Sequence, residues 1–222
     1  LNEHAPIDHL RKLRDSHDAD GVSRDLWRSF GDMGFSGVLI PEAQGGSGLG
    51  AVEAGVVAEA LGRTLTPSPF LSSGVLAATA LKAGSGEQQA AWLPRIAAGE
   101  AMVSRAVDEA GKHAPHRIRT TAERSGNGFK LNGTKGFVLD GHVADALIVT
   151  ARTSGEAGGE SMDGLTLFLI DPKTAGVEVE RTVMVDAHNA ARVTLNDVEV
   201  TADAVLGPAD GGGEILERVL NL

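Results

Sequence analysis

Apolar side chains recur at helical spacing through the first hundred residues of the chain. Leu26, Phe30 and Met33 follow one another at intervals of four and three residues. Ser23 precedes them, and its hydroxyl can cap the N-terminus of a helix. The pattern predicts a helix with one buried stripe that ends near Gly34.

A second helix is expected over residues 51–61, closed by Gly62, because glycine readily adopts the left-handed conformation that ends many helices. Two sets of apolar residues have the helical spacing needed to form its buried face. They are Val52, Val56 and Ala60, or Val57 and Leu61.

Two more helices are expected before residue 100. The first covers residues 70–82 and stops at Gly84. The second begins after Ser85, whose hydroxyl can bond the backbone while the side chain of Gln88 reaches back, the reciprocal spacing of a capping box. Gly99 closes this helix, whose apolar face consists of Trp92, Leu93 and Ile96.

Beyond Gly99 the apolar positions change to a period of two, which is typical of strands. The pair Asn127-Gly128 lies between two alternating segments and predicts a hairpin turn, because both residues tolerate positive φ. The pair Asn132-Gly133 is interpreted as a second turn. Strands are expected at residues 118–123, 129–131, 136–139, 146–151, 165–170, 177–181, 191–195 and 198–200.

This change of period favours a multi-domain α+β fold. An N-terminal all-α helical domain is expected over residues 1–100, followed by an antiparallel β-barrel or sandwich domain over residues 101–207. Residues 153–163, rich in Gly, Ser and Glu, are interpreted as a solvent loop between strands. Helical spacing returns at residues 213–222, so residues 208–222 are expected to begin a further helical domain.

Composition disfavours several classes of function. The 222 residues contain no cysteine, which removes disulfides, iron–sulfur clusters and cysteine nucleophiles. The net charge of −10 and the lack of any long run of Lys or Arg disfavour nucleic acid as a partner. No apolar stretch is long enough to span a membrane, and the N-terminus shows no signal sequence, so a cytoplasmic location is expected.

Two motifs have both a chemical and a structural interpretation. The glycine-rich residues 45–50 could cradle a phosphate, but neither G-x-G-x-x-G nor the P-loop spacing can be written there, which favours a tight turn between packed helices. His113 and His116, near Asp108 and Glu109, could form a weak metal site. Their spacing favours a polar surface loop instead, and no metal is expected.

Three blocks of sequence follow one another along the chain. They read LWRSFGDMGFSG and then IPEAQGGSGLG within residues 26–50, GEQQAAWLPRIAAGE at residues 86–100, and LNGTK at residues 131–135. Asp145-Ala146 and Ala151-Arg152-Thr153 follow the last block. Together the blocks resemble the N-terminal helical and middle β-domains of the acyl-CoA dehydrogenase family, and the resemblance spans nearly the whole chain.

The resemblance implies a flavoprotein subunit that binds FAD and dehydrogenates an acyl-CoA substrate between its α and β carbons. In this reaction a carboxylate removes the α-proton while the β-hydrogen leaves as hydride to the flavin. The family's base belongs to a C-terminal helical bundle that is expected to be absent here, so the base is expected beyond Leu222. The chain alone is not expected to turn over acyl-CoA. The family also implies an electron-transfer partner and a homo- or hetero-oligomer.

The resemblance places the flavin against two segments, aligned with the family patterns L-T-E-P-x-x-G-S-D and W-I-T/S-N-G. Ala106 and Leu139 stand where the family has hydroxyls, which weakens the expected hold on the flavin. Lys112 replaces a serine and either pairs with the cofactor pyrophosphate or is a solvated loop lysine. The cofactor-binding residues so implied are Val103, Ala106, Val107, Gly111, Lys112, Phe137, Val138 and Leu139.

Two rival functions remain open. One is a non-catalytic partner subunit with a degenerate flavin site in a heteromeric acyl-CoA dehydrogenase, which the missing hydroxyls at Ala106 and Leu139 favour. The other is a binding domain without a cofactor, whose exposed apolar face would associate with other chains.

Overall fold

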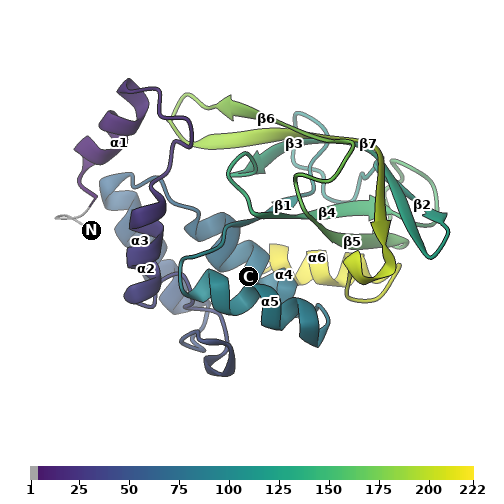
Figure 1. Ribbon diagram of the computed structural model, residues 1–222, viewed down its shortest axis with the longest axis horizontal. Coiled ribbons are helices and arrows are strands. Elements are labelled where there is room, and N and C mark those ends of the chain that lie inside the picture. The colour runs from purple at the N-terminus through teal and green to yellow at the C-terminus, as the bar shows by residue number, and fades with distance from the viewer. Residues whose placement is uncertain (1–4) are drawn as a thin grey trace.

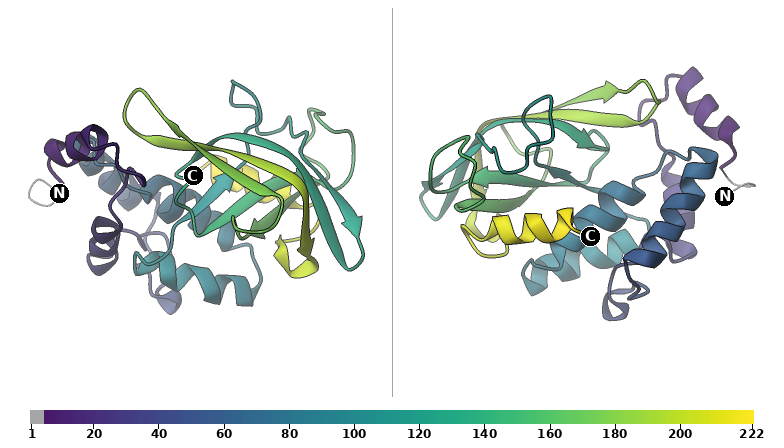
Figure 2. Two further views of the ribbon diagram at one scale, coloured as in Figure 1. Left: turned by 45° about the horizontal axis from the view of Figure 1, so that its top comes forward. Right: turned by 180° about the vertical axis from the view of Figure 1, so that it is seen from behind.

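The computed structural model describes residues 5–222, in which a group of helices packs against a curved sheet (Figure 1). The helix α6 (Gly212–Leu220) follows the sheet in sequence and lies beside the helices of the first hundred residues (Figure 2). The earlier helices are α1 (Ile7–Asp15), α2 (Arg24–Asp32), the 3-10 helix η1 (Glu42–Gln44), α3 (Ala51–Thr64), the π-helix η2 (Phe70–Ala77), α4 (Ala78–Leu81) and α5 (Gly86–Ala97).

Within the described residues the sheet has eight strands, in the order β6-β7-β3-β2-β4-β5-β8, with β1 paired to β4 off this path. Two pairings, β1 with β4 and β2 with β4, are parallel, and the other ladders are antiparallel. The strands are β1 (Val103–Ala106), β2 (Thr121–Ser125), β3 (Gly128–Leu139), β4 (Ala146–Arg152), β5 (Leu165–Ile170), β6 (Val177–Val183), β7 (Asn189–Thr201) and β8 (Val205–Leu206), with the 3-10 helix η3 (Ala202–Ala204) before β8.

The expected α+β class, a helical part followed by an antiparallel-rich sheet, is therefore confirmed. After the sheet, residues 5–222 contain only α6 and no helical bundle. None of the described helices combines the length and the apolar character that crossing a membrane requires.

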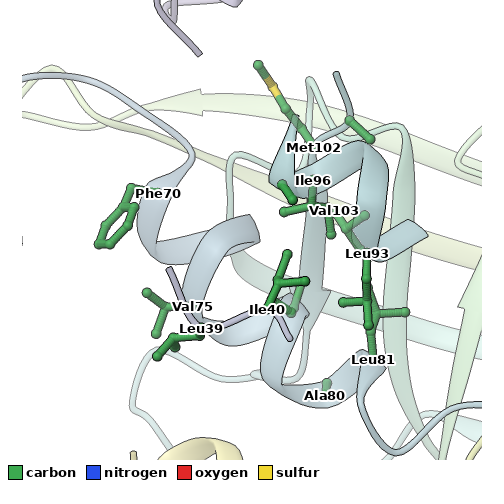
Figure 3. Close-up of a cluster of buried hydrophobic side chains, with 14 of the residues drawn as sticks. Leu39, Ile40, Phe70, Val75, Ala80, Leu81, Leu93, Ile96, Met102 and Val103 are labelled. Atoms are coloured by element: carbon green, nitrogen blue, oxygen red, sulfur yellow. The ribbon is translucent and has the colours of Figure 1, made fainter. Parts of the chain in front are cut away.

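One hydrophobic core joins the helical part to the sheet. Figure 3 shows Leu93 and Ile96 of α5 close to Met102 and Val103, where the chain enters β1. All four side chains are fully buried. Burying a large apolar side chain contributes roughly 1.5–3 kcal/mol, so this shared core holds the helices and β1 in a fixed relationship. A second core lies within the sheet, where the rings of Phe129 and Phe168 meet edge to face at 5.2 Å.

Two of the expected helix starts are confirmed by hydrogen bonds. The backbone N–H of Leu26 donates to the Ser23 hydroxyl at 3.1 Å, and that of Gln88 donates to the Ser85 hydroxyl at 3.2 Å. The backbone N–H of Ser85 donates in return to the Gln88 side chain at 3.0 Å, which completes the capping box.

Other expectations about the helices are wrong. Met33 is 45% exposed because α2 ends at Asp32, and Trp27 takes the buried position instead. The helix α3 continues through Gly62 to Thr64 and ends where Leu65 turns left-handed, with φ 50°. The expected helix end at Gly62 is therefore wrong. The helix α1 was not anticipated.

Of the two sets of residues proposed for the buried face of α3, the set of Val57 and Leu61 is the correct one. Leu61 is buried and Val57 is half-buried, whereas Val52 and Val56 are 76% and 63% exposed. Val52 and Val56 therefore lie on the solvent side of α3, which also carries the exposed Glu59–Arg63 ion pair.

The turn expectations in the sheet need correction. The first hairpin exists, but its turn residues are Gly126 and Asn127, while Gly128 begins β3 opposite Ser125. The pair Asn132-Gly133 makes no turn. It lies within β3, opposite a β-bulge in β7: from Leu131 to Gly133 the strand β3 advances by two residues while β7 advances by three, from Val198 to Leu195.

The same bulges explain why the number of strands was misjudged. Residues 129–131 and 136–139 belong to one strand, β3, and residues 191–195 and 198–200 belong to one strand, β7. The short strands β1 and β8 were not expected. Residues 153–163 do form the loop between β4 and β5, and Arg152 donates to the carbonyl oxygens of Ser161 and Asp163 at 2.9 and 2.7 Å.

The glycine-rich residues 45–50 form a turn between η1 and α3. A Cβ at Gly46 would clash with the carbonyl of Ile40, so this close approach requires glycine. Gly37 lies similarly close to Ala97 of α5. These contacts support the tight-turn interpretation.

Candidate functional site

A cavity of about 480 Å³ opens between the helical part and the sheet. Its walls come from η2, from the segment that follows β1, and from the end of β3. The lining residues are Ser72, Leu76, Arg105, Val107, Asp108, Ala110, Gly111, Lys112, His113, Phe137 and Leu139.

An irregularity in β3 directs Phe137 into this cavity. The pairing of β3 with β7 shifts register between Lys135 and Val138, and Phe137 has φ 53°. Left-handed backbone at a bulky residue costs about 1–3 kcal/mol and is found mostly where function requires it. As a result, Phe137 is 61% exposed and Leu139 lines the same cavity, while Val138 between them is fully buried.

A buried ion pair holds the segment after β1 against β3. The ammonium group of Lys135 is fully buried and donates to Glu109 at 2.7 Å and to the carbonyl oxygen of Val107 at 3.2 Å. Glu109 also accepts hydrogen bonds from the backbone N–H and the hydroxyl of Thr120, at 2.9 and 2.6 Å. These contacts fix the backbone that carries the cavity lining.

Burial and pairing act in opposite directions on these two groups. Burial lowers the pKa of Lys135 to about 8, although the neighbouring Glu109 carboxylate opposes that shift. Burial alone would raise the pKa of Glu109. The charge of Lys135 and the hydrogen bonds from Lys135 and Thr120 outweigh burial, and the pKa of Glu109 lies below its ordinary value.

Ser72 and Asp140 connect the helical part to the sheet beside the cavity. The Ser72 hydroxyl donates to Asp140 at 2.7 Å, and Asp140 has a left-handed backbone with φ 53°. Burial raises the pKa of Asp140 to about 6, while the Ser72 hydrogen bond and the nearby His188 lower it in part.

Arg105 is the unusual cation of the cavity wall. Its Nε and Nη1 atoms are buried, and they have no hydrogen-bond partner in the described part of the chain. Burial lowers the pKa of Arg105, and the carboxylate of Asp108 opposes that shift. Asp108 itself accepts from the backbone N–H of Ala114 at 3.2 Å and lies 3.0 Å from Nδ1 of His113.

The structure gathers five of the eight implied flavin-binding residues at this cavity. They are Val107, Gly111, Lys112, Phe137 and Leu139. The other three, Val103, Ala106 and Val138, are fully buried in the two hydrophobic cores and do not line the cavity. Side-chain contact is consequently available at Val107, Lys112, Phe137 and Leu139, and backbone contact at Gly111.

Sequence reasoning missed Ser72 and Leu76 on the cavity wall. It placed Arg105 within the flavin-facing range of residues 103–112 but gave it no role, and it did not foresee the anchoring roles of Lys135 and Glu109. A partial signal existed for Lys135, which ends the LNGTK block that carries the family resemblance. No signal in the sequence paired it with Glu109. Among residues 5–222, no group of three or more His, Asp or Glu side chains could hold a metal ion, and His113 bonds Asp108 instead.

A second cavity, of about 530 Å³, adjoins the first through Leu139. Its lining is mostly apolar and comes from α3, η2 and the connection between β6 and β7. Leu65 and Leu71 of this lining are 48% and 52% exposed. These residues make the groove an exposed apolar surface of the described chain.

Comparison with known proteins agrees with this architecture. Residues 5–100 match the family model described as "Acyl-CoA dehydrogenase, N-terminal domain", and residues 108–198 match "Acyl-CoA dehydrogenase, middle domain". The long-chain specific acyl-CoA dehydrogenase of Sus scrofa mitochondria is 32% identical over 200 residues, covering 87% of this chain and 46% of the relative. Acyl-CoA dehydrogenase FadE27 of Mycobacterium tuberculosis is 34% identical over 188 residues, covering 84% and 47%.

Solved structures show the same likeness. The ChsE4-ChsE5 complex from Mycobacterium tuberculosis matches with a TM-score of 0.82 and 30% identity, covering 98% of this chain and 55% of that chain. An acyl-CoA dehydrogenase from Geobacillus kaustophilus matches with a TM-score of 0.84 and 25% identity, covering 99% and 58%. The chain spans about half the length of the curated relatives it matches. Both family models and these relatives place the chain in the acyl-CoA dehydrogenase family.

Proposed function

We propose that the chain forms the helical and β-sheet parts of a FAD-dependent acyl-CoA dehydrogenase, which removes hydrogen from the α and β carbons of an acyl-CoA thioester. The observation that supports this most is the 480 Å³ cavity, which sets the exposed ring of Phe137 beside the cationic side chains of Arg105 and Lys112. We also propose the domain division expected from the sequence, at residues 1–100, 101–207 and 208–222.

The cavity lining fits a flavin cofactor in two respects. The exposed faces of Phe137, Leu139 and Leu76 offer apolar surface to a planar ring. Arg105 and Lys112 offer positive charge to phosphate groups. When bound, the flavin would accept the hydride that leaves the β carbon. The residues of this chain would hold the ring flat, exclude water from it and neutralise the charge of the cofactor.

The lining departs from the family pattern at the hydroxyl positions. Ala106 is fully buried and has no hydroxyl, and Leu139 presents only methyl groups to the cavity. Each missing neutral hydrogen bond lowers affinity by about 1 kcal/mol. We therefore expect flavin binding that depends on stacking, backbone N–H groups and charge, and that is weaker than the family pattern implies.

A visible absorption spectrum of the purified full-length protein tests the proposal. Flavin bands are expected, either as isolated or after titration with FAD, and an acyl-CoA substrate should bleach them. A colourless protein that takes up no FAD would contradict the proposal.

A second candidate function is a non-catalytic partner subunit in a heteromeric acyl-CoA dehydrogenase. The missing hydroxyls at Ala106 and Leu139 favour it, and so does the apolar groove, because exposed hydrophobic patches commonly mark protein interfaces. One solved relative is itself titled as a two-component complex, ChsE4-ChsE5. An electron-transfer partner belongs to either proposal.

Co-expression with a neighbouring homologue separates the two candidates. If the chain is a partner subunit, the yellow colour of flavin is expected only in the mixed complex. A yellow homomer that reduces its flavin with acyl-CoA supports the enzyme and contradicts the partner function.

A further inference from the structure

The guanidinium of Arg105 lacks an acceptor although much of it is buried. Both Nε and Nη1 are shielded from solvent without a hydrogen-bond partner in residues 5–222. Burying a charged donor without an acceptor is costly, because the group loses its hydration and receives nothing in return. A ligand in the cavity can supply the missing acceptor.

The backbone around Arg105 is rigid enough to position a ligand. Arg105 lies in β1, paired with Ile148 of β4 in a parallel ladder. The segment that follows is held by the Lys135–Glu109 ion pair, and the neighbouring strand residues Ser104 and Ala106 are fully buried. A side chain on a fixed strand recognises a ligand more accurately than one on a free loop.

The chemistry of the surrounding wall favours an anion. Arg105, Lys112 and His113 all line the cavity, whereas Asp108 is its only lining carboxylate among the described residues. The oxygens of Asp108 are already engaged by Ala114 and His113. With His neutral, Arg105 and Lys112 outnumber the single carboxylate of Asp108 in the lining, whereas the chain as a whole has a net charge of −10. A guanidinium offers two parallel donors that match a carboxylate or a phosphate.

We propose that Arg105 binds an oxyanion of the cavity's ligand, either a phosphate group of the nucleotide cofactor or a carboxylate carried by the acyl substrate. The identity of these ligands rests on the proposed function, whereas the anion site itself rests on the unpaired guanidinium. Phe137, on the same wall, packs against the planar or apolar part of the ligand.

Calorimetric titration of the purified full-length protein with two simple probes tests the site. The probes are inorganic pyrophosphate and succinate, at low ionic strength. The wild type is expected to bind at least one of them, and Arg105→Gln should weaken that binding about tenfold or more, the size expected for a charged hydrogen bond. Arg105→Lys should restore part of the loss. The control Arg218→Gln changes an exposed arginine on α6 and should leave the affinity unchanged.

Flavin titrations identify the source of the anion. If Arg105 receives a phosphate, Arg105→Gln weakens pyrophosphate and FAD and leaves riboflavin, which has no phosphate, unchanged. If it receives a carboxylate, the variant weakens succinate and leaves FAD and riboflavin unchanged. If neither the wild type nor any variant binds a flavin, the proposed function is contradicted. The pyrophosphate and succinate titrations still test the anion site at Arg105 in that case.

Thermal unfolding separates ligand binding from a structural role. Arg105→Gln is expected to keep or raise the melting temperature, because it removes a largely buried charge whose Nε and Nη1 atoms lack acceptors in residues 5–222. A lowered melting temperature with unchanged probe affinities would show that Arg105 only supports the fold. Two further results would overturn the proposal. One is that the wild type binds neither probe, and the other is that the wild type and Arg105→Gln bind both probes with the same affinity.

Discussion

The ammonium group of Lys135 lies 2.7 Å from the carboxylate of Glu109, and the two side chains have exposed fractions of 0% and 9%. The pair joins β3 to the segment that lines the candidate cofactor cavity. Since each group is the nearest opposite charge of the other in this buried place, removing either member leaves the remaining charge buried without its counter-ion.

Replacing Lys135 with Met should therefore destabilise the protein by about 3–5 kcal/mol, because the Glu109 charge stays buried without its partner. Urea unfolding measures the change. The control is Lys130→Met on the same strand, whose exposed pair with Glu199 at 3.8 Å should contribute less than about 1 kcal/mol. Equal losses for the two variants would show that burial does not govern the pair.

Asp140 should make stability depend on pH. Its folded pKa of about 6 lies above the ordinary value of 3.8. The neutral form thus favours the folded state: its contribution is complete below the unfolded pKa and is lost as the pH rises through the folded pKa. Asp140→Asn stays neutral, so its stability relative to the wild type should increase between about pH 4 and pH 7, by roughly 1–3 kcal/mol.

Asp197→Asn is the matched control for this pH experiment. Asp197 also has a left-handed backbone, with φ 50°, but its side chain is exposed. Any benefit of asparagine in that conformation appears in both variants and at both pH values. A pH-independent difference for Asp140→Asn would rule out its titration as the cause.

Phe137→Ala should weaken flavin binding with little effect on the fold. The ring is 61% exposed and lines the cavity, so its removal costs stacking with the ligand and little core packing. Fluorescence titration with FAD should show a loss of about 1 kcal/mol, or roughly fivefold. Leu71→Ala removes a side chain that is 52% exposed and lines only the neighbouring apolar groove, so it should leave FAD affinity unchanged. Similar FAD affinities for the wild type and Phe137→Ala would contradict the placement of the flavin ring.

Two glycines of β3 should respond differently to a methyl group. Gly133 has φ 154°, and an added Cβ would clash with the Thr120 hydroxyl and lie 2.8 Å from its Cα. Gly133→Ala should destabilise the protein by about 1–3 kcal/mol, measured by urea unfolding, and should disturb the hydrogen bonds from Thr120 to Glu109. Gly136→Ala meets no atom within 4 Å and should change stability by less than about 0.5 kcal/mol. Equal tolerance of the two substitutions would contradict the close approach of Gly133 to Thr120.

Most of the helices and strands could be predicted because their signals are local; α1, β1 and β8 were the exceptions. Ser23 and Ser85 cap helices through partners three residues away, and β5 occupies the expected residues 165–170. The failures were also local in origin. Gly62 predicted the end of a helix and Gly133 predicted a turn, but α3 continues through Gly62 and β3 continues through Gly133. Packing over many residues outweighs the conformational preference of one residue.

By itself, the sequence determined the succession of a helical part and a strand-rich part, and the two segments that meet at the cavity. Only the tertiary structure decided which side chains enter that cavity. It paired Lys135 with Glu109 across 26 residues and Ser72 with Asp140 across 68, and it left Arg105 without an acceptor. The physical reason is that local hydrogen bonding is encoded by neighbouring residues, whereas burial and charge pairing depend on where the folded chain brings distant residues together.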